Sequence, residues 1–178
     1  MQPNLDFGKH VIPYCHKNGA PMYAYEFNGY WKDVGTLTSY WEANMELIDV
    51  VPEFNLYEEY WKIYTKSEIL PPQYVAKGGV IERSIVGEGS EIYGQVYNSV
   101  IGCGVTIGKD TVVRDSIIMN NTEIGASCEL SKAIVAENTK ITSDWASGRK
   151  HRTILHRIFT ATVLSLLVRR ALCLPMYL

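Results

Sequence analysis

The fold is decided by the sequence IGCGVTIG at residues 101–108, which returns in outline as IMNNTEIG at residues 118–125 and as VAENTKI at residues 135–141. Successive copies start 17 residues apart, and the aliphatic residues within them stand six, six and five positions apart. Neither the 3.6-residue period of a helix nor the two-residue alternation of a half-buried strand runs through the segment. Short strands joined by tight turns, each placing one aliphatic side chain inside a triangular coil, explain the spacing. The sequence therefore predicts a parallel β-helix over residues 75–141.

The coils before residue 101 are looser but keep a similar spacing, with aliphatic residues at Val75, Ile81, Val86 and Ile92. The whole pattern resembles the hexapeptide-repeat family, which implies a left-handed β-helix. That hand follows from the resemblance alone, since it departs from the usual right-handed crossover. Members of this family include acyltransferases, relatives of carbonic anhydrase and domains appended to nucleotidyltransferases, so the fold alone does not select a function.

The positions of the histidines argue against two of these three functions. Hexapeptide acyltransferases depend on a histidine base, and the related carbonic anhydrases on histidine zinc ligands. His10, His16, His151 and His156 all lie outside residues 75–141. The β-helix is therefore predicted to have a structural, oligomerising or regulatory role.

The composition excludes several classes of partner. The chain has 178 residues, 47% of them hydrophobic, and a formal net charge of −2. No basic field is present that would bind nucleic acid or an anionic membrane, so neither is expected as a partner. The four cysteines form no CxxC pair, and the amino terminus has no charged-then-apolar signal segment. These features predict reduced thiols and a cytoplasmic location.

The chain before the repeat divides into two regions. Residues 1–50 are expected to be mixed α/β, with a helix over about 8–17, an aromatic-rich strand at 22–27 and a second helix over about 38–49. Residues 51–74 form a linker that contains Pro71-Pro72, which imposes an extended path. Its clustered aromatic residues are expected to form a packing surface between two domains, in preference to a ligand site; they are Tyr57, Tyr60, Trp61 and Tyr64.

The second helix has an amino-terminal signal of its own. Ser39 and Glu42 have the spacing of a capping box, and Pro52 is expected to end the helix. An apolar stripe at helical spacing would face the core; it consists of Leu37, Tyr40 or Trp41, Met45 and Ile48.

Two motifs point to one family. DFGKHVIP at residues 6–13, and GYWKDVGT at 29–36 followed by YWEANM at 40–45, resemble conserved segments of bacterial ADP-glucose pyrophosphorylases, the glucose-1-phosphate adenylyltransferases. With the repeat, the resemblance covers about residues 4–141. It implies the end of a Rossmann-like nucleotidyltransferase domain, then a left-handed parallel β-helix that takes part in tetramer contacts and allosteric control. It also implies synthesis of ADP-glucose and pyrophosphate from ATP and glucose 1-phosphate, with Mg²⁺, for glycogen synthesis.

The resemblance assigns roles to particular residues. Asp33 matches the family's carboxy-terminal metal-binding aspartate, and a carboxylate is the ligand that Mg²⁺ needs during nucleotidyl transfer. Asp6, Phe7 and Trp31 match positions that line the glucose 1-phosphate pocket. Alternative roles are a turn residue for Asp33, a helix cap for Asp6 and core packing for Phe7 and Trp31. Lys32 is either solvated or close to a phosphate.

Some parts of the family pattern have no counterpart in these residues. The glycine-rich nucleotide loop, the first catalytic aspartate and the sugar-phosphate lysine are not found, so we expect the isolated chain to be inactive. Residues 142–178 lack the six-residue aliphatic spacing, and we interpret them as a tail foreign to the family, with a frameshift as one explanation and an amphipathic helix as another.

Two alternatives to a catalytic subunit remain open. One is the non-catalytic subunit that partners it in a homo- or hetero-tetramer of the same family. The intact Lys32-Asp33-Val34 favours the catalytic type, because a subunit without metal binding would not need Asp33. The other is a β-helix that assembles or binds a partner without chemistry of its own.

Overall fold

The computed structural model describes residues 6–56, 58–60, 62, 64 and 69–142. The chain divides into two compact units, Met1–Trp31 and Lys32–Leu178. Among the described residues, no helix is both long enough and apolar enough to cross a membrane. The interpretation of residues 142–178 as a foreign tail falls, from residue 143 onward, outside the described residues.

The first unit contains one continuous helical segment, as predicted for residues 8–17. It begins as a π-helix, η1 (Phe7–Val11), and continues as α1 (Ile12–Lys17), with proline in the first turn of α1. Asn18 caps the end, and Gly19 follows with a φ of 70°. Glycine takes up this left-handed conformation without a steric penalty, which explains why the helix ends there.

The strand predicted at residues 22–27 is wrong. These residues have no regular secondary structure, and their aromatic side chains face solvent: Tyr23 is 95% exposed and Tyr25 is 89% exposed. A strand is held by hydrogen bonds to a neighbouring strand, and within the described residues none pairs with this segment. High β-propensity was therefore not enough to form the strand.

The second unit opens with helix α2 (Leu37–Glu46), which confirms the predicted helix but changes its ends. Thr36 is the N-cap, and Ser39 is the third helical residue of the capping box, so the predicted box of Ser39 and Glu42 is wrong. The helix also ends at Glu46, before the predicted residue 49. The predicted stripe is half-buried at Tyr40, Trp41, Met45 and Ile48, whereas Leu37 is 45% exposed.

The linker at residues 51–74 has no helix or strand in its described part before Tyr74. The expected aromatic packing surface is wrong for the two members that the structure describes. Tyr60 is 97% exposed and Tyr64 is 87% exposed. Tyr57 and Trp61 lie outside the described residues.

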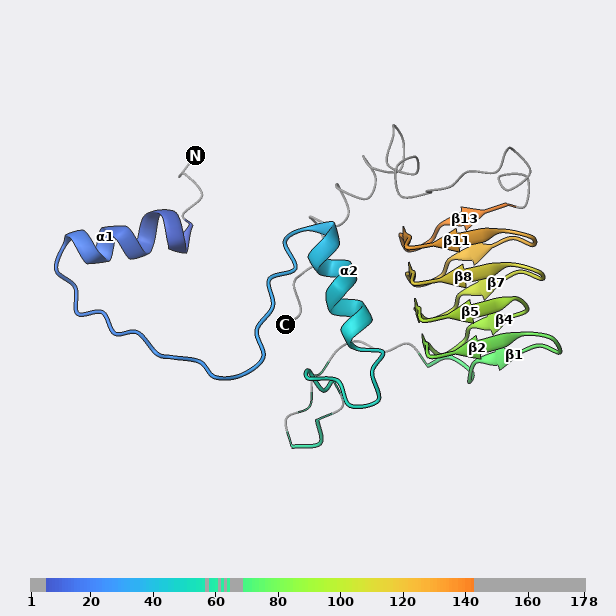
Figure 1. Cartoon of the computed structure of the whole chain (residues 1–178). Helices are drawn as coiled ribbons and strands as arrows, with labels where there is room; N and C mark the ends of the chain where they lie inside the picture. Colours follow the sequence, from blue (N-terminus) through green and yellow to red (C-terminus); the bar gives the residue numbers. More distant parts are fainter. Residues whose placement is uncertain (1–5, 57, 61, 63, 65–68, 143–178) are drawn as a thin grey trace. The chain divides into compact units, whose positions relative to one another are not determined.

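The β-helix is confirmed and begins one residue earlier than predicted. Thirteen short strands of the described chain form three parallel sheets. Each of the four complete coils contributes one strand to each sheet, and β13 adds a further strand to the first sheet (Figure 1). The first sheet has the order β1-β4-β7-β10-β13, the second β2-β5-β8-β11 and the third β3-β6-β9-β12. The strands are β1 (Tyr74–Val75), β2 (Val80–Glu82), β3 (Ile85–Val86), β4 (Glu91–Ile92), β5 (Gln95–Tyr97), β6 (Val100–Ile101), β7 (Thr106–Ile107), β8 (Val112–Arg114), β9 (Ile117–Ile118), β10 (Glu123–Ile124), β11 (Glu129–Ser131), β12 (Ile134–Val135) and β13 (Lys140–Ile141).

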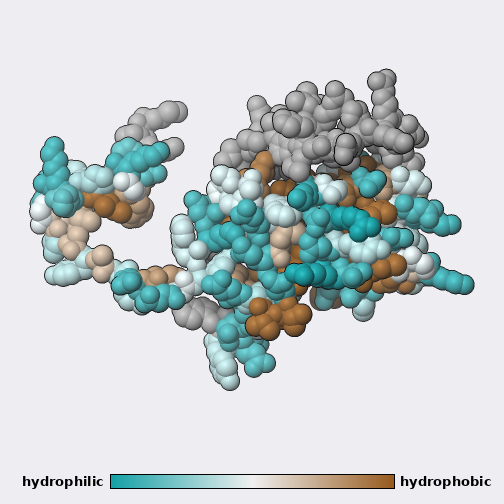
Figure 2. Space-filling view, viewed as in Figure 1, coloured by the Kyte–Doolittle hydropathy of each residue, from teal (hydrophilic) through white to brown (hydrophobic). Residues whose placement is uncertain are grey.

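The core consists of three columns of aliphatic side chains, one column for each sheet. In the first sheet Ile92 pairs with Ile107, Ile107 with Ile124 and Ile124 with Ile141. The side chains of Ile92, Ile107 and Ile124 are fully buried. From Ile107 onward, the register therefore places each aliphatic residue of this column over its copy in the next coil, as the 17-residue spacing predicted. The visible face of the β-helix is mostly hydrophilic, with smaller apolar areas (Figure 2).

The looser spacing of the early coils comes from one shortened corner. Only Tyr93 and Gly94 connect β4 to β5, whereas four residues connect β7 to β8, so Ile92 and Ile107 are 15 residues apart. A Cβ on Gly94 would lie 2.4 Å from the main-chain oxygen of Thr111. Glycine is therefore required where the short corner lies against the next coil.

Candidate functional site

Asp33 lies in the exposed segment that leads into α2. Its Oδ1 atom accepts a hydrogen bond from the main-chain N–H of Gly35 at 2.9 Å, which closes a turn just before the helix. A Cβ on Gly35 would lie 3.0 Å from this same oxygen, so glycine leaves room for the turn. The second oxygen, Oδ2, makes no hydrogen bond to another described residue. The structure thus supports the turn role for Asp33 and still leaves one carboxylate oxygen for a ligand.

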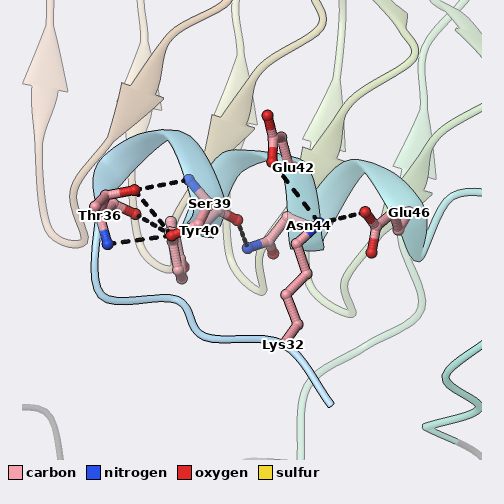
Figure 3. Close-up of polar contacts among 7 residues, drawn as sticks. All are labelled: Lys32, Thr36, Ser39, Tyr40, Glu42, Asn44 and Glu46. Atoms are coloured by element: carbon pink, nitrogen blue, oxygen red, sulfur yellow. Dashed lines mark hydrogen bonds and ion pairs between the residues drawn. The ribbon is translucent and has the colours of Figure 1, made fainter. Parts of the chain in front are cut away.

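Lys32, which precedes this aspartate, is held against α2. Its Nζ atom donates a hydrogen bond to Oε1 of Glu46 and lies 3.8 Å from Oε2 of Glu42 (Figure 3). The Lys32 side chain is 23% exposed, so this ion pair is partly shielded from solvent. The lysine therefore does not extend freely into solvent, and it connects the Asp33 segment to the last turn of the helix.

The capping box holds the other end of the same segment. The main-chain N–H of Ser39 donates to Oγ1 of Thr36 at 3.1 Å, and the N–H of Thr36 donates to Oγ of Ser39 at 3.1 Å (Figure 3). These bonds satisfy two main-chain donors that the start of a helix leaves open. Asp33 is therefore followed, three residues later, by a well-defined helix start.

Helix α2 also contacts the β-helix. The residues that make this contact were not predicted from the sequence. The indole N–H of Trp41 donates a hydrogen bond to the main-chain oxygen of Asp115 at 2.7 Å. Arg83 Nη2 lies 2.7 Å from Oδ1 of Asp49, just beyond the end of the helix. Burial raises the pKa of the neighbouring Tyr40 phenol. The sequence signal was limited to the position of Trp41 in the apolar stripe.

A shallow pocket of about 400 Å³ lies on the β-helix, lined by Glu82, Arg83, Tyr97, Asn98 and Arg114. The guanidinium of Arg114 stacks over the ring of Tyr97, with its Cζ atom 4.2 Å from the ring centroid. Arg83 is paired with Asp49, and Glu82 adds a negative charge to the lining. One of the two guanidinium groups of this pocket is therefore already paired with a carboxylate.

The predicted substrate-binding residues belong to the first unit. Asp6 is an N-cap, since its Oδ1 atom accepts a hydrogen bond from the main-chain N–H of Lys9 at 2.7 Å. Its own N–H donates to Nδ1 of His10 at 3.0 Å. Phe7 and Trp31 are 75% and 77% exposed, so neither ring packs in a core. The cap proposed for Asp6 is thus observed, whereas the core role considered for the two aromatic residues is not.

The described residues contain no group of three or more His, Cys, Asp or Glu side chains that could hold a metal ion. Asp33 is in the second unit and has no such cluster around it. A single carboxylate such as that of Asp33 is compatible with Mg²⁺, which is commonly held by one or two carboxylates, with phosphates and waters filling the other positions. It is not compatible with a metal site made entirely by the described protein residues.

Comparison with protein families finds two matches in order along the chain. Residues 2–50 match the nucleotidyl transferase family, and residues 71–167 match the GlmU-like C-terminal hexapeptide family. The second match covers more than half of the 178 residues and continues past Ile141, into a part that the structure does not describe.

Several curated proteins are similar to large parts of this chain. The chain is 69% identical over 106 residues to a protein of Lachnospira eligens named glucose-1-phosphate adenylyltransferase, a match covering 60% of this chain and 25% of that protein. Proteins of the same name from Acetivibrio thermocellus and Fervidobacterium nodosum are 48% and 47% identical, over 76% and 82% of this chain. Those two matches cover 32% and 35% of the relatives, so the chain spans about a third or less of these proteins.

Proposed function

The chain belongs to the GlmU-like C-terminal hexapeptide family, and we propose that it is part of a glucose-1-phosphate adenylyltransferase. The observation that carries this proposal is the 69% identity to a protein of that name. The match of residues 2–50 to the nucleotidyl transferase family supports it independently. The reaction would join ATP and glucose 1-phosphate into ADP-glucose and release pyrophosphate, as a step of glycogen synthesis.

In this proposal Asp33 is the metal-binding residue of the chain. Its Oδ2 atom would bind Mg²⁺, while Oδ1 keeps the bond to the N–H of Gly35 that fixes the carboxylate in its turn. The ion would neutralise charge that develops on the phosphates during transfer. The contribution of the chain is to hold one carboxylate in a preorganised position, because an oriented charge costs no rearrangement during the reaction.

Asp6, Phe7 and Trp31 are proposed to bind the sugar phosphate. Their exposure supports this, since the rings of Phe7 and Trp31 are not used in a core and can cover the apolar face of a sugar. Asp6 uses one oxygen as a helix cap, and a carboxylate can accept further hydrogen bonds from sugar hydroxyls.

The β-helix is proposed to be a rigid scaffold for assembly into a homo- or hetero-tetramer of family members. Its described part has a continuous aliphatic core, which supports a role as a rigid scaffold. Cys15, Cys103 and Cys128 are free thiols, which supports a reducing, cytoplasmic location for the enzyme.

A chimera tests the proposal directly. This chain would replace the matching residues of the Lachnospira eligens protein, and pyrophosphate release would be measured with ATP, glucose 1-phosphate and Mg²⁺. Activity that requires all three reagents is the expected result. An assembled but inactive chimera would instead favour the non-catalytic subunit, and a chimera that neither assembles nor reacts would count against the family function.

A further inference from the structure

We propose that Trp41 is a positioning residue for Asp33, because its hydrogen bond to the β-helix keeps α2 folded and α2 in turn holds the Asp33 turn. The β-helix would then control the geometry of the metal-binding segment as well as assembly. The functional meaning of this inference rests on the proposed function, whereas the physical coupling can be measured without it.

Helix α2 is only marginally stable by itself. The helix has ten residues, and none of them is fully buried. Isolated helices shorter than about 12–15 residues are marginal in water, because nucleation costs more than a few hydrogen bonds return. The capping box helps at one end, but the helix depends on contacts with the rest of the unit to remain folded.

The α2 region is joined to the β-helix by polar contacts. Between residues that the structure describes, these include the Trp41–Asp115 hydrogen bond and the Arg83–Asp49 ion pair. Both side chains of the ion pair are more than half exposed, and exposed ion pairs contribute little. The indole bond is partly buried and has a good length of 2.7 Å. Trp41 is therefore the principal polar contact.

The acceptor of this hydrogen bond, the main-chain oxygen of Asp115, belongs to a residue that is held by the preceding coil. Asp115 occupies a corner of the β-helix with a φ of 48°, and its N–H donates to the main-chain oxygen of Tyr97 at 3.1 Å. Its Oδ1 atom also accepts a hydrogen bond from Nδ2 of Asn98 at 2.6 Å. Main chain and side chain are both tied to the preceding coil, so the carbonyl that Trp41 uses is fixed in the scaffold.

The folded helix α2 in turn restrains the segment around Asp33. Lys32 is paired with Glu46, at the opposite end of the helix from Thr36, and this pairing requires the whole length of α2 to be folded (Figure 3). The Thr36–Ser39 bonds likewise exist only when the first turn is helical. If α2 opens, both restraints that flank Asp33 are lost.

The test uses the full 178-residue chain carrying Trp41→Phe, which removes the N–H donor and keeps an aromatic ring. Amide hydrogen exchange, followed by NMR, should become about fivefold faster within α2 and at Gly35, as expected for the loss of one typical hydrogen bond. Exchange in the β-helix strands, for example at Ile107, should not change. Thr38→Ala, at an exposed position of the same helix, is the control and should leave Gly35 unaffected.

A second variant distinguishes the Lys32–Glu46 ion pair from the Trp41–Asp115 hydrogen bond. Lys32→Gln should speed exchange at Gly35 while α2 keeps most of its protection, since the Trp41 bond remains. Unchanged exchange at Gly35 in Trp41→Phe would overturn the inference, and so would a uniform acceleration that includes the β-helix.

The chimera adds a functional measurement. Trp41→Phe should raise the Mg²⁺ concentration for half-maximal activity severalfold, whereas a merely structural role would lower the active fraction and leave that concentration unchanged. The latter result would overturn the inference. If Gly35 exchanges faster but the chimera has no activity, the proposed function fails and the coupling stands.

Discussion

The main-chain N–H of Ser116 donates a hydrogen bond to the hydroxyl of Ser99 at 3.1 Å, one coil earlier in the β-helix. The hydroxyl of Ser99 in turn donates to the main-chain oxygen of Tyr97 at 2.7 Å. The same arrangement joins Ser84 to Ser99 and Ser116 to Ala133, and Ser99 and Ser116 are fully buried. A column of serines therefore satisfies the main-chain N–H groups that the corner leaves outside the sheets.

Ser116→Ala should destabilise the β-helix because it leaves the N–H of Ala133 buried without a partner. The expected loss is about 1–3 kcal/mol in the free energy of unfolding. Urea denaturation monitored by circular dichroism measures it. Ser131→Ala, at an exposed position of β11, is the matched control and should change stability by less than about 0.5 kcal/mol. Equal stability of the two variants would show that the buried hydroxyl does not matter.

Asp33→Asn in the chimera should lower kcat on the order of a hundredfold or more, because it removes one preorganised charge from the proposed Mg²⁺ site. The asparagine oxygen can still accept the N–H of Gly35, so the turn should persist. Pyrophosphate release at saturating Mg²⁺ is the measurement. Asp110→Asn, in an exposed corner of the β-helix, should leave kcat unchanged. A kcat near that of the unsubstituted chimera would identify Asp33 as a turn residue only.

The isolated 178-residue chain should form no ADP-glucose from ATP, glucose 1-phosphate and Mg²⁺. The described residues offer one candidate metal carboxylate and no metal-binding cluster, and the sequence has no glycine-rich nucleotide loop. Product would be sought by chromatography after long incubation, with the Lachnospira eligens enzyme as the positive control. Product formation above the enzyme-free background would contradict the prediction.

Cys128 should react with iodoacetamide much more slowly than Cys103. Its side chain is 5% exposed, and burial raises its pKa, so less of the reactive thiolate exists at any given pH. Cys103 is partly exposed on the same β-helix and serves as an internal reference. Peptide mapping by mass spectrometry at pH 8 measures both rates. Urea should unfold the protein and accelerate the reaction of Cys128. Comparable rates for the two cysteines in the native protein, with no acceleration of Cys128 in urea, would contradict the prediction.

The β-helix was predictable from sequence because its signal is local and repeated. Most coils repeat the same spacing of aliphatic residues, and stacking places each copy above the previous one whatever the rest of the chain does. The serine column also has a sequence signature, since a serine stands directly before the aliphatic pairs at residues 85–86, 100–101 and 117–118. Its partners could not be named before the coils were aligned.

The strand expected at residues 22–27, in contrast, could not be predicted from local sequence. Its aromatic residues have strong β-propensity, yet strand formation depends on a partner that no property of those six residues supplies. The capping box was misplaced for a smaller reason. Thr36–Ser39 and Ser39–Glu42 have the same spacing, and only the backbone conformation shows that Thr36 precedes the first helical residue.

The sequence by itself thus determined the β-helix, its 17-residue repeat and the helical nature of α2, because all of these follow from spacing along the chain. It also pointed to Asp33 as a candidate metal ligand, through a motif of adjacent residues that resembles a known family, and this role stays a prediction. Only the tertiary structure decided that Trp41 binds Asp115, 74 residues away, and that Lys32 is paired with Glu46. Hydrogen bonds between distant residues depend on how folded elements meet in space, and a single sequence contains no period or spacing that records such a meeting.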